Sequence, residues 1–326
     1  MTTTPDFDSL WNYSNPAESE QRFRRLLPGP QDPAWRAELL SQLARALGLQ
    51  RRFDEAHQIL DQAQELLGDG HLRARVRCLL ERGRVLNSSG DPASSRALFQ
   101  SAWELAREAG EEYLSVDALH MLAIVDSPES RPEWNERAIQ AAEASTDPRT
   151  RSWAASLYNN SGWSKMDLGR YDEALQAFQR AVGFREAQGK PDETRIARWC
   201  VARALRALGR REEALAIQQA LLAEWTQAGA EDGYVSEELG ELLLEQGQPE
   251  AARPHFSEAH RLLSQDAWLV EQEASRLARL KSLAEAPHNP LPEELPSPDN
   301  PDQTNPDQTN PDQTNPDQAN PDPQNQ

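Results

Sequence analysis

Apolar and small residues recur every three or four positions along most of this chain, which is the spacing of amphipathic helices. The clearest example is the stretch 155–188, which the pattern divides into two helices joined by a tight turn at Gly169. Four residues mark the buried side of the second of these helices: Tyr171, Ala174, Phe178 and Ala181. The pattern therefore predicts a helical hairpin in the middle of the chain.

The same hairpin signal recurs with a fixed internal spacing. A small residue in the first helix is followed twelve positions later by a small residue in the second, in five pairs: Ala44 and Ala56, Gly83 and Ser95, Gly162 and Ala174, Ala202 and Ala214, and Gly240 and Ala252. The second members lie 38 to 40 residues apart, with one double step of 79 residues from Ser95 to Ala174. Small residues at both places let paired helices approach closely. Since the double step spans two repeats, the five pairs and the one hairpin between them give about six hairpins.

This spacing resembles the fingerprint of the tetratricopeptide repeat, whose usual period is about 34 residues. The resemblance implies an all-α fold, namely a right-handed α-solenoid of about six helix hairpins. The expected repeats are approximately residues 34–68, 71–109, 111–146, 148–189, 191–229 and 230–264. Residues 7–285 also resemble uncharacterised bacterial tetratricopeptide proteins of long period, through the segments LYNNSGW, RIARWCVARALRALGR and DGYVSEELGE. HEAT repeats have a similar period but lack this spacing, so they are the second interpretation.

Residues 1–33 form an extension before the first repeat. A short helix is expected after Asn15 and Pro16, because Asn caps free N–H groups and Pro suits the first helical position. Four large apolar residues lie upstream of it: Phe7, Leu10, Trp11 and Tyr13. We expect them to cover the open end of the array, since an exposed terminal repeat must be covered. The alternative is that they fold into the groove of the array and occlude it.

Two different segments follow the last repeat. A single helix is expected over residues 265–286 as the closing cap of the array. Residues 287–326 then repeat the motif PDQTN and hold eight acidic residues but no basic one. Because no large apolar residue follows Leu295, this tail cannot offset its ordering entropy and is predicted to be disordered. A spacer is favoured over a specific docking tail.

The charge balance argues against several classes of partner. The net charge is −19, and since eight of the 53 acidic residues lie in the tail, the rest of the chain carries 45 against all 34 basic residues. Nucleic acids and anionic membranes require a basic surface, so neither is expected as a partner. The two cysteines form no metal-ligand motif, and neither a metal nor a cofactor is expected. With no recognisable leader or long apolar stretch, a cytoplasmic location is expected.

The family resemblance also points to a set of binding residues, because the first helices of tetratricopeptide repeats line a concave groove. The predicted groove residues are Arg84, His120, Asn159, Asn160, Trp163, Trp199, Arg203, Arg206, Tyr234, Glu237 and Glu241. Further groove positions in the first three repeats are Glu38, Ser41, Arg45, Arg77, Leu80, Asn87, Asp117 and Ile124, and the sixth repeat adds Leu244. Arginine and asparagine beside aromatic residues suit a peptide backbone or a carboxylate. The predicted groove is basic and aromatic in its middle and acidic toward the C-terminal end.

Packing inside the array is the competing interpretation of the same residues. Tryptophan at helical spacing is more often a core residue than a ligand anchor. Arg203 and Arg206 could equally pair with Glu237 or Glu241 of the next repeat. The lysine-based carboxylate clamp of some family members is not expected, because the chain has only Lys165, Lys190 and Lys281.

Three functions remain open at this point. The leading hypothesis is a protein–protein interaction scaffold that binds a peptide or a partner segment in the groove. The second is a bacterial regulator that senses a signalling peptide or a small molecule. The third is an enzyme that uses His120 with a carboxylate such as Asp117 or Glu237 as acid and base. No nucleotide-binding, zinc-protease or serine-hydrolase motif supports the third, so a function without catalysis is favoured. The sequence does not indicate an oligomeric state.

Overall fold

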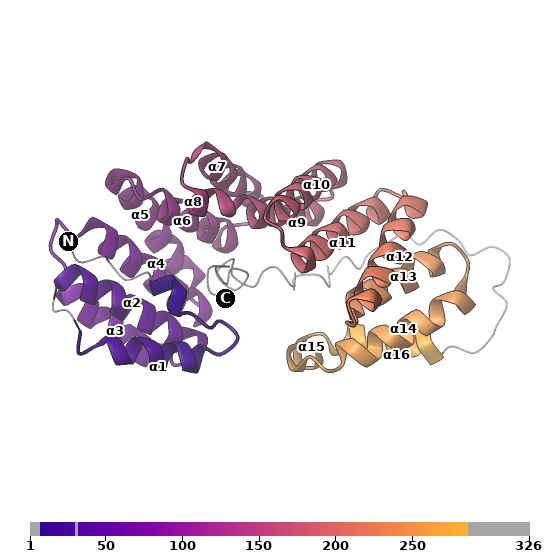
Figure 1. Cartoon of the computed structure of the whole chain (residues 1–326), viewed down its shortest axis with the longest axis horizontal. Helices are drawn as coiled ribbons and strands as arrows, with labels where there is room; N and C mark the ends of the chain where they lie inside the picture. Colours follow the sequence, from indigo (N-terminus) through magenta and orange to yellow (C-terminus); the bar gives the residue numbers. More distant parts are fainter. Residues whose placement is uncertain (1–6, 30–31, 286–326) are drawn as a thin grey trace. The chain divides into compact units, whose positions relative to one another are not determined.

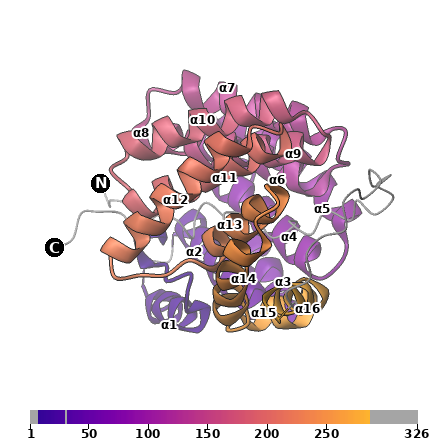
Figure 2. The ribbon, with the colours of Figure 1, turned by 90° about the vertical axis from the view of Figure 1, so that its right-hand side faces the viewer.

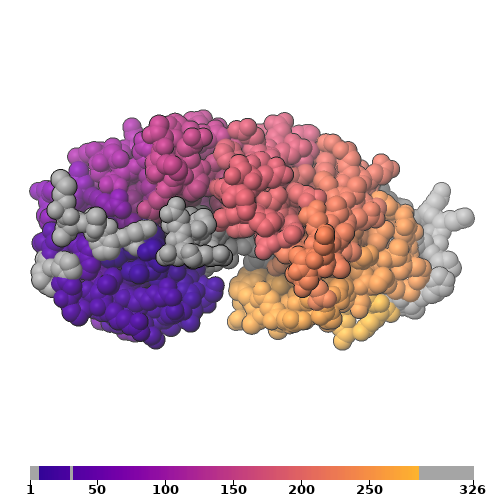
Figure 3. Space-filling view, viewed as in Figure 1, coloured from indigo at the N-terminus to yellow at the C-terminus, as the bar shows by residue number. Residues whose placement is uncertain are grey.

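The structure, a computed structural model, describes residues 7–29 and 32–285 of the chain. Every regular element in these ranges is a helix, which confirms the all-α prediction. The chain divides into two compact units, and the boundary falls after Ser164. Each unit is a closely packed body of its own, unit 1 in indigo to magenta and unit 2 in red to yellow (Figure 3). The predicted tail, residues 287–326, lies outside the described residues.

Unit 1 begins with a 3-10 turn and continues as paired helices (Figure 1). Its elements are η1 (Phe7–Leu10), α1 (Pro16–Leu26), α2 (Pro33–Leu49), α3 (Phe53–Glu65), α4 (Leu72–Ser88), α5 (Pro92–Ala109), α6 (Glu112–Val125), α7 (Arg131–Ala144), α8 (Pro148–Ser152) and most of α9 (Ala154–Asp167). Each long helix packs against the next one along the chain, from α1 to α7. The first helices of successive repeats, α2, α4 and α6, also contact one another.

Unit 2 continues the same pattern. Its elements are α10 (Tyr171–Ala187), α11 (Pro191–Ala207), α12 (Arg211–Gln227), α13 (Gly233–Glu245), α14 (Pro249–Leu263), α15 (Ala267–Gln272) and α16 (Ala274–Glu285). The predicted closing helix is thus two helices, because the backbone leaves the helical conformation at Glu273. After this break α16 packs along α14, and Figure 2 shows the two helices side by side. The apolar periodicity carries no signal of the break.

Close approach of paired helices explains why the spacing of small residues recurs along the chain. A Cβ atom on Gly83 would lie 2.5 Å from the ring of Phe99, and one on Gly240 would lie 2.7 Å from the ring of Phe256. Both rings are fully buried, so they have no room to move aside. The glycines at these positions are therefore a packing requirement, as the spacing predicts.

The third repeat is irregular, as its two prolines indicate. Helix α6 ends at Val125, the next residue Asp126 has an extended backbone, and α7 starts only at Arg131. The side chain of Asp126 accepts hydrogen bonds from Trp134 Nε1 at 2.7 Å and from Arg96 at 2.9 Å, which ties the loop to its neighbours. The short helix α8, capped by Asp147, was not expected from the sequence.

The N-terminal extension covers the first repeat. Asn15 caps α1 by accepting a hydrogen bond from the backbone N–H of Glu18, which confirms the predicted helix start. The ring of Phe23 in α1 is fully buried in the core made with α2 and α3, and Leu10 and Trp11 pack against the same core. These residues therefore pack on the first repeat, and their role as an end cover stays a prediction.

Candidate functional site

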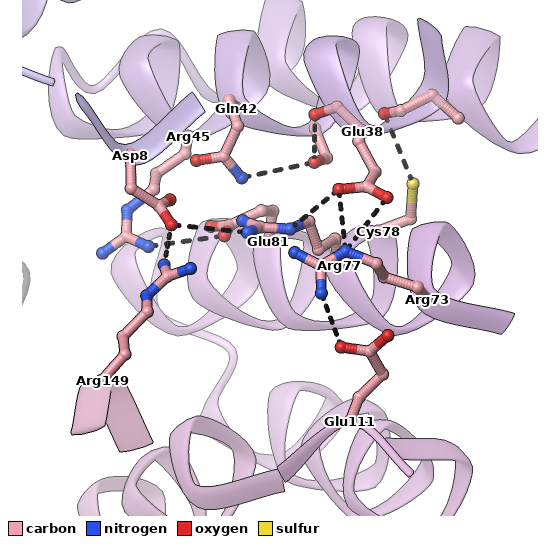
Figure 4. Close-up of polar contacts among 12 residues, drawn as sticks. Asp8, Glu38, Gln42, Arg45, Arg73, Arg77, Cys78, Glu81, Glu111 and Arg149 are labelled. Atoms are coloured by element: carbon pink, nitrogen blue, oxygen red, sulfur yellow. Dashed lines mark hydrogen bonds and ion pairs between the residues drawn. The ribbon is translucent and has the colours of Figure 1, made fainter. Parts of the chain in front are cut away.

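Five arginines and five carboxylates form an ion-pair network of two separate branches on the first helices of unit 1 and the segments beside them. Figure 4 shows the first branch and the Arg45–Glu81 pair of the second. We call the surface made by α2, α4 and α6 that carries these residues the first-helix face of unit 1. Two branches make up the network. In the first branch, Glu38 of α2 lies 3.2 Å from Arg77 and 3.3 Å from Arg73, both of α4.

The second branch runs through Glu81 of α4. Its carboxylate lies 3.4 Å from the Arg45 guanidinium and accepts a hydrogen bond from Arg84 at 2.8 Å, and Arg84 also donates to Asp117 of α6. Glu81 is almost fully buried, and a buried ion pair that loses one partner typically costs about 3–5 kcal/mol. The network therefore fixes the positions of these guanidinium groups on the face.

A cavity of about 230 Å³ opens beside the second branch of the network. Its lining comes from α2, α4 and α6: Arg45, Gly48, Leu49, Arg84, Val85, Asn87, Ser88, His120, Met121 and Ile124. Leu49 is 39% exposed and Ile124 is 43% exposed, and only two other large apolar residues of the described chain are as exposed. The cavity thus combines accessible apolar side chains with ion-paired arginines and with asparagine and histidine side chains.

His120 is held at the inner wall of this cavity. Its side chain is buried, its Nδ1 atom lies 3.4 Å from the amide nitrogen of Asn160, and its ring lies 5.4 Å from the ring of Trp153. The structure therefore brings together three of the predicted groove residues of unit 1, namely Arg84, His120 and Asn160.

Residues of the N-terminal extension also lie on the first-helix face of unit 1. The carboxylate of Asp8 contacts the guanidinium of Arg149 and lies 3.6 Å from that of Arg77 (Figure 4). Trp11 Nε1 donates a 2.9 Å hydrogen bond to Gln42 of α2. The extension therefore contacts the first-helix face of unit 1, while occlusion of the groove, the alternative drawn from the sequence, stays a prediction.

Two aromatic rings of the extension contact an arginine that the cavity shares. The rings of Trp11 and Tyr13 are stacked with their centroids 4.7 Å apart. The Arg45 guanidinium lies 5.5 Å from each centroid, within the range of a cation–π interaction. Arg45 therefore connects the N-terminal segment to the cavity.

The predicted groove residues of unit 2 are packed and paired. Trp199 is only 6% exposed, donates a hydrogen bond to the backbone oxygen of Tyr234 at 3.2 Å, and packs edge-on against the Tyr234 ring. Arg203 and Arg206 both donate to Glu238 of α13. The packing interpretation is favoured for these residues, although their partner is Glu238 and not Glu237 or Glu241.

The acidic end of the predicted groove is neutralised by the closing helix. Arg276 of α16 pairs with Glu237 at 2.6 Å, and Arg279 pairs with Glu241. Burial raises the pKa of the Tyr234 hydroxyl to about 12, so this side chain stays neutral between these charges. In unit 2 the pattern of acidic residues therefore serves to fasten α16.

Asn159 and Trp163, on α9 of unit 1, complete the predicted set. Both are buried, with Trp163 only 6% exposed, so neither presents a free surface for a ligand. The sequence interpretation missed Leu49 and Met121 of the cavity, and it missed Asp8 and Arg149. Leu49 is the last residue of α2 and lies beyond the groove positions that the repeat pattern supplies.

Other kinds of site find little support in the described ranges. Residues 7–29 and 32–285 contain no group of three or more histidine, cysteine or acidic residues that could hold a metal ion. Within the same ranges no helix is sufficiently long and apolar to cross a membrane. Burial raises the pKa of the Cys78 thiol to about 12, which keeps this cysteine protonated and unreactive.

Comparison with known families agrees with the helix pairing. A tetratricopeptide repeat family model matches residues 159–229 and 201–267, and a second tetratricopeptide repeat model matches residues 36–72. The chain is a tetratricopeptide repeat protein. The resemblance inferred from the spacing of small residues is therefore confirmed. No curated protein sequence matches the chain.

Several solved structures share the fold of this tetratricopeptide repeat protein. RapI in its apo form superposes with a TM-score of 0.67 at 11% identity, over 85% of this chain and 79% of RapI. A signal transduction ATPase with a tetratricopeptide repeat sensor from Pyrococcus horikoshii gives 0.64 at 14% identity over 81% of this chain, which spans only 41% of that protein. BtubC from P. vanneervenii gives 0.54 at 16% identity, over 70% and 94%. At these identities the likeness shows the fold alone.

Proposed function

We propose that this tetratricopeptide repeat protein is an interaction scaffold that binds an extended peptide segment on the first-helix face of unit 1. The observation that carries the proposal is the cavity between α2, α4 and α6, where exposed Leu49 and Ile124 lie beside fixed arginine groups. An apolar side chain of the peptide enters the cavity. Exposed apolar side chains rimmed by polar groups are typical of interaction sites.

The size of the cavity separates a peptide from a free small molecule. Pockets for drug-sized ligands usually measure about 300–1,000 Å³, whereas this cavity measures about 230 Å³. It suits a single side chain whose backbone continues along the face. A regulator that senses a signalling peptide would use the same surface, so it remains within the proposal, whereas sensing of a small molecule is disfavoured.

Polar groups at the rim suit a peptide backbone. Asn87 is half-buried at the cavity, and its amide offers both a donor and an acceptor, which is what a backbone N–H and C=O require. Arg45 and Arg84 line the cavity beside it, each ion-paired with Glu81. We assign no catalytic step to this face, because Asp117 accepts a hydrogen bond from Arg84 and is held as an ion-pair partner.

The experiment selects peptides from a displayed random library on the purified full-length chain. Binding of the selected peptides is then measured for the wild type and for the double variant Leu49→Glu/Ile124→Glu. The double variant places two negative charges at the cavity, and we expect the affinity to fall at least tenfold. Both side chains are exposed, so the fold tolerates the substitutions.

The control is Val270→Glu in α15, which adds a negative charge at an equally exposed apolar position of unit 2. This variant should bind the selected peptides as the wild type does. Equal binding by all three proteins would contradict the proposed site. Loss of binding in Val270→Glu alone would place the site in unit 2.

A further inference from the structure

The N-terminal segment, which we define as residues 7–13, contacts the first-helix face of unit 1 through side chains of three kinds. Asp8 brings a carboxylate to Arg77 of α4 and Arg149 of α8. Trp11 and Tyr13 bring aromatic rings to Arg45 of α2. The segment thus crosses elements of three expected repeats with an acid and two aromatic residues, which is how a bound peptide would lie.

Positive charge on this part of the face matches the acid of the segment. Arg149 also lies over the ring of Tyr113, with its guanidinium 3.8 Å from the ring centroid. Arg77 is buried against Glu38 and extends toward Asp8 (Figure 4). Two guanidinium groups that converge on one carboxylate form a recognition site for an acidic side chain.

The ion pair of Asp8 with Arg149 is accessible to solvent, so another acidic group can replace Asp8. The side chain of Asp8 is 30% exposed and that of Arg149 is 37% exposed, so water and salt reach the pair. Phe7, in contrast, is buried against Trp35 and anchors the start of the segment in the core. Asp8 can therefore leave the face while Phe7 and α1 stay in place. Release of Trp11, on which the Tyr13 ring is stacked, also requires the loss of its hydrogen bond to Gln42 and of its ring contact with Phe23.

We infer that residues 8–13 are an internal ligand of the first-helix face, and that the external partner is a peptide of the same chemistry. Its recognised features are an acidic residue, an aromatic residue three positions later and a second aromatic residue five positions later, as in Asp8, Trp11 and Tyr13. The partner displaces the internal segment from Arg77, Arg149 and Arg45. Since Arg45 also lines the cavity, the inference rests on the proposed function and specifies its partner.

Tethering adds to the contacts that hold the internal segment in place. A short flexible link keeps a ligand at an effective concentration of about millimolar. An external peptide therefore competes poorly until it makes additional contacts, such as a side chain in the cavity. The segment raises the threshold for binding and rejects peptides that carry only the acidic and aromatic features.

The experiment uses a fluorescent synthetic peptide with the sequence of residues 8–14, DSLWNYS, as the probe. Fluorescence anisotropy measures its binding to the full-length wild type and to the variant Asp8→Ala/Trp11→Ala/Tyr13→Ala. We expect the triple variant to bind the probe at least ten times more tightly than the wild type. A probe that carries Asp8→Lys should lose this preference, because it repels Arg77 and Arg149.

Two controls keep the result interpretable. Asp54→Ala removes an exposed acid of α3 outside the face and should bind the probe as the wild type does. If thermal unfolding shows that the triple variant is not folded, the single variant Asp8→Ala is compared with the wild type instead. We expect its affinity for the probe to be at least three times higher. Equal affinity of the probe for wild type and variant, or no binding to the folded variant, overturns the inference.

Failure of this inference and failure of the proposed function give different results. If selected library peptides need Leu49 and Ile124 but the probe does not distinguish the wild type from the triple variant, only the internal ligand is excluded. If the probe prefers the triple variant but library peptides ignore the cavity substitutions, only the cavity is excluded.

Discussion

The first-helix face of unit 1 and its counterpart in unit 2, made by α11 and α13, contain the same kinds of residues and differ in what covers them. In unit 2, Arg203 and Arg206 are paired with Glu238, which is only 2% exposed, and α16 supplies arginines to the neighbouring acids. In unit 1, the face keeps an open cavity, and its covering segment is held partly by the exposed pair of Asp8 and Arg149. The charged groups of both faces are largely buried in ion pairs, and the difference lies in the cavity of unit 1 with its exposed Leu49 and Ile124.

This difference shows that arginine and aromatic residues at groove positions do not by themselves indicate a binding site. The residue that contacts them from the next helix determines whether they are available to a ligand. Glu238 lies 35 residues after Arg203 and closes that position from the next repeat. Ile124 lies at a groove position of unit 1 and remains 43% exposed. The exposure of apolar side chains at the cavity, and not the presence of arginine and aromatic residues, therefore separates the two faces.

Loss of the buried acid in unit 2 should give the largest effect. Glu238→Ala leaves two buried guanidinium groups without their shared partner, and a broken buried ion pair costs about 3–5 kcal/mol. Chemical denaturation should show a loss of this size, and hydrogen exchange should place it in α11 and α13. A loss below about 1 kcal/mol would mean that unit 2 is not sealed by this network.

Substitution of the small residues at the helix contacts should have the next largest effect. Gly83→Ala forces a Cβ atom against the ring of Phe99, and such overpacking costs about 1–3 kcal/mol. The control is Gly183→Ala in α10, where a Cβ atom would meet no atom within 4 Å. That substitution should stabilise its helix by about 0.5–1 kcal/mol. Destabilisation by both, measured by thermal unfolding, would contradict the close-packing explanation.

Low pH should weaken the ion pairs of Glu238 with Arg203 and Arg206 in unit 2. Burial opposes ionisation of Glu238, but Arg203 and Arg206 outweigh it and hold the pKa of Glu238 below its ordinary value of 4.5. The stabilisation is therefore fully present above pH 4.5 and is lost as the pH falls through the folded-state pKa. Asp232 acts in the opposite sense, because burial raises its pKa.

Comparison with Glu238→Gln isolates the contribution of this carboxylate, since Asp232 is present in both proteins. The advantage of the wild type in unfolding free energy should be constant from pH 7 to about pH 5 and then shrink below pH 4.5. An advantage that stays the same down to pH 3 would show that the carboxylate is not the titrating group.

The exposed pair in unit 1 should give the smallest effect on stability. Asp8→Ala should lower the unfolding free energy by about 0–1 kcal/mol, because exposed ion pairs contribute little. Deuterium uptake at residues 9–13 should nevertheless increase, since the segment is released. A loss as large as that in Glu238→Ala would remove the contrast between the two faces.

Much of the fold follows from local rules that the sequence displays. The contact of Gly83 with Phe99 and the cap of Asn15 on α1 depend on residues close in the chain, and both are predictable. The pairing of Arg203 with the next repeat was also foreseen as an alternative. The choice of Glu238 over Glu237 was not, because it depends on how α13 is rotated against α11.

The candidate site could be predicted only in part, for a related reason. Arg84 and His120 lie at predicted groove positions, and both line the cavity. Leu49 contributes through the end of its helix, and the repeat pattern does not specify that position. The contact of Asp8 with Arg149 joins residues 141 positions apart, and no periodicity connects them.

Site-specific photo-crosslinking tests the central claim most directly, namely that the face of unit 1 binds a peptide while that of unit 2 is sealed. A photoreactive amino acid replaces Ile124 in one protein and Leu244, a groove position of α13, in a second. Each protein is irradiated with a peptide selected on the wild-type chain. We predict a crosslink from position 124 and none from position 244. A crosslink from position 244 alone would contradict the account.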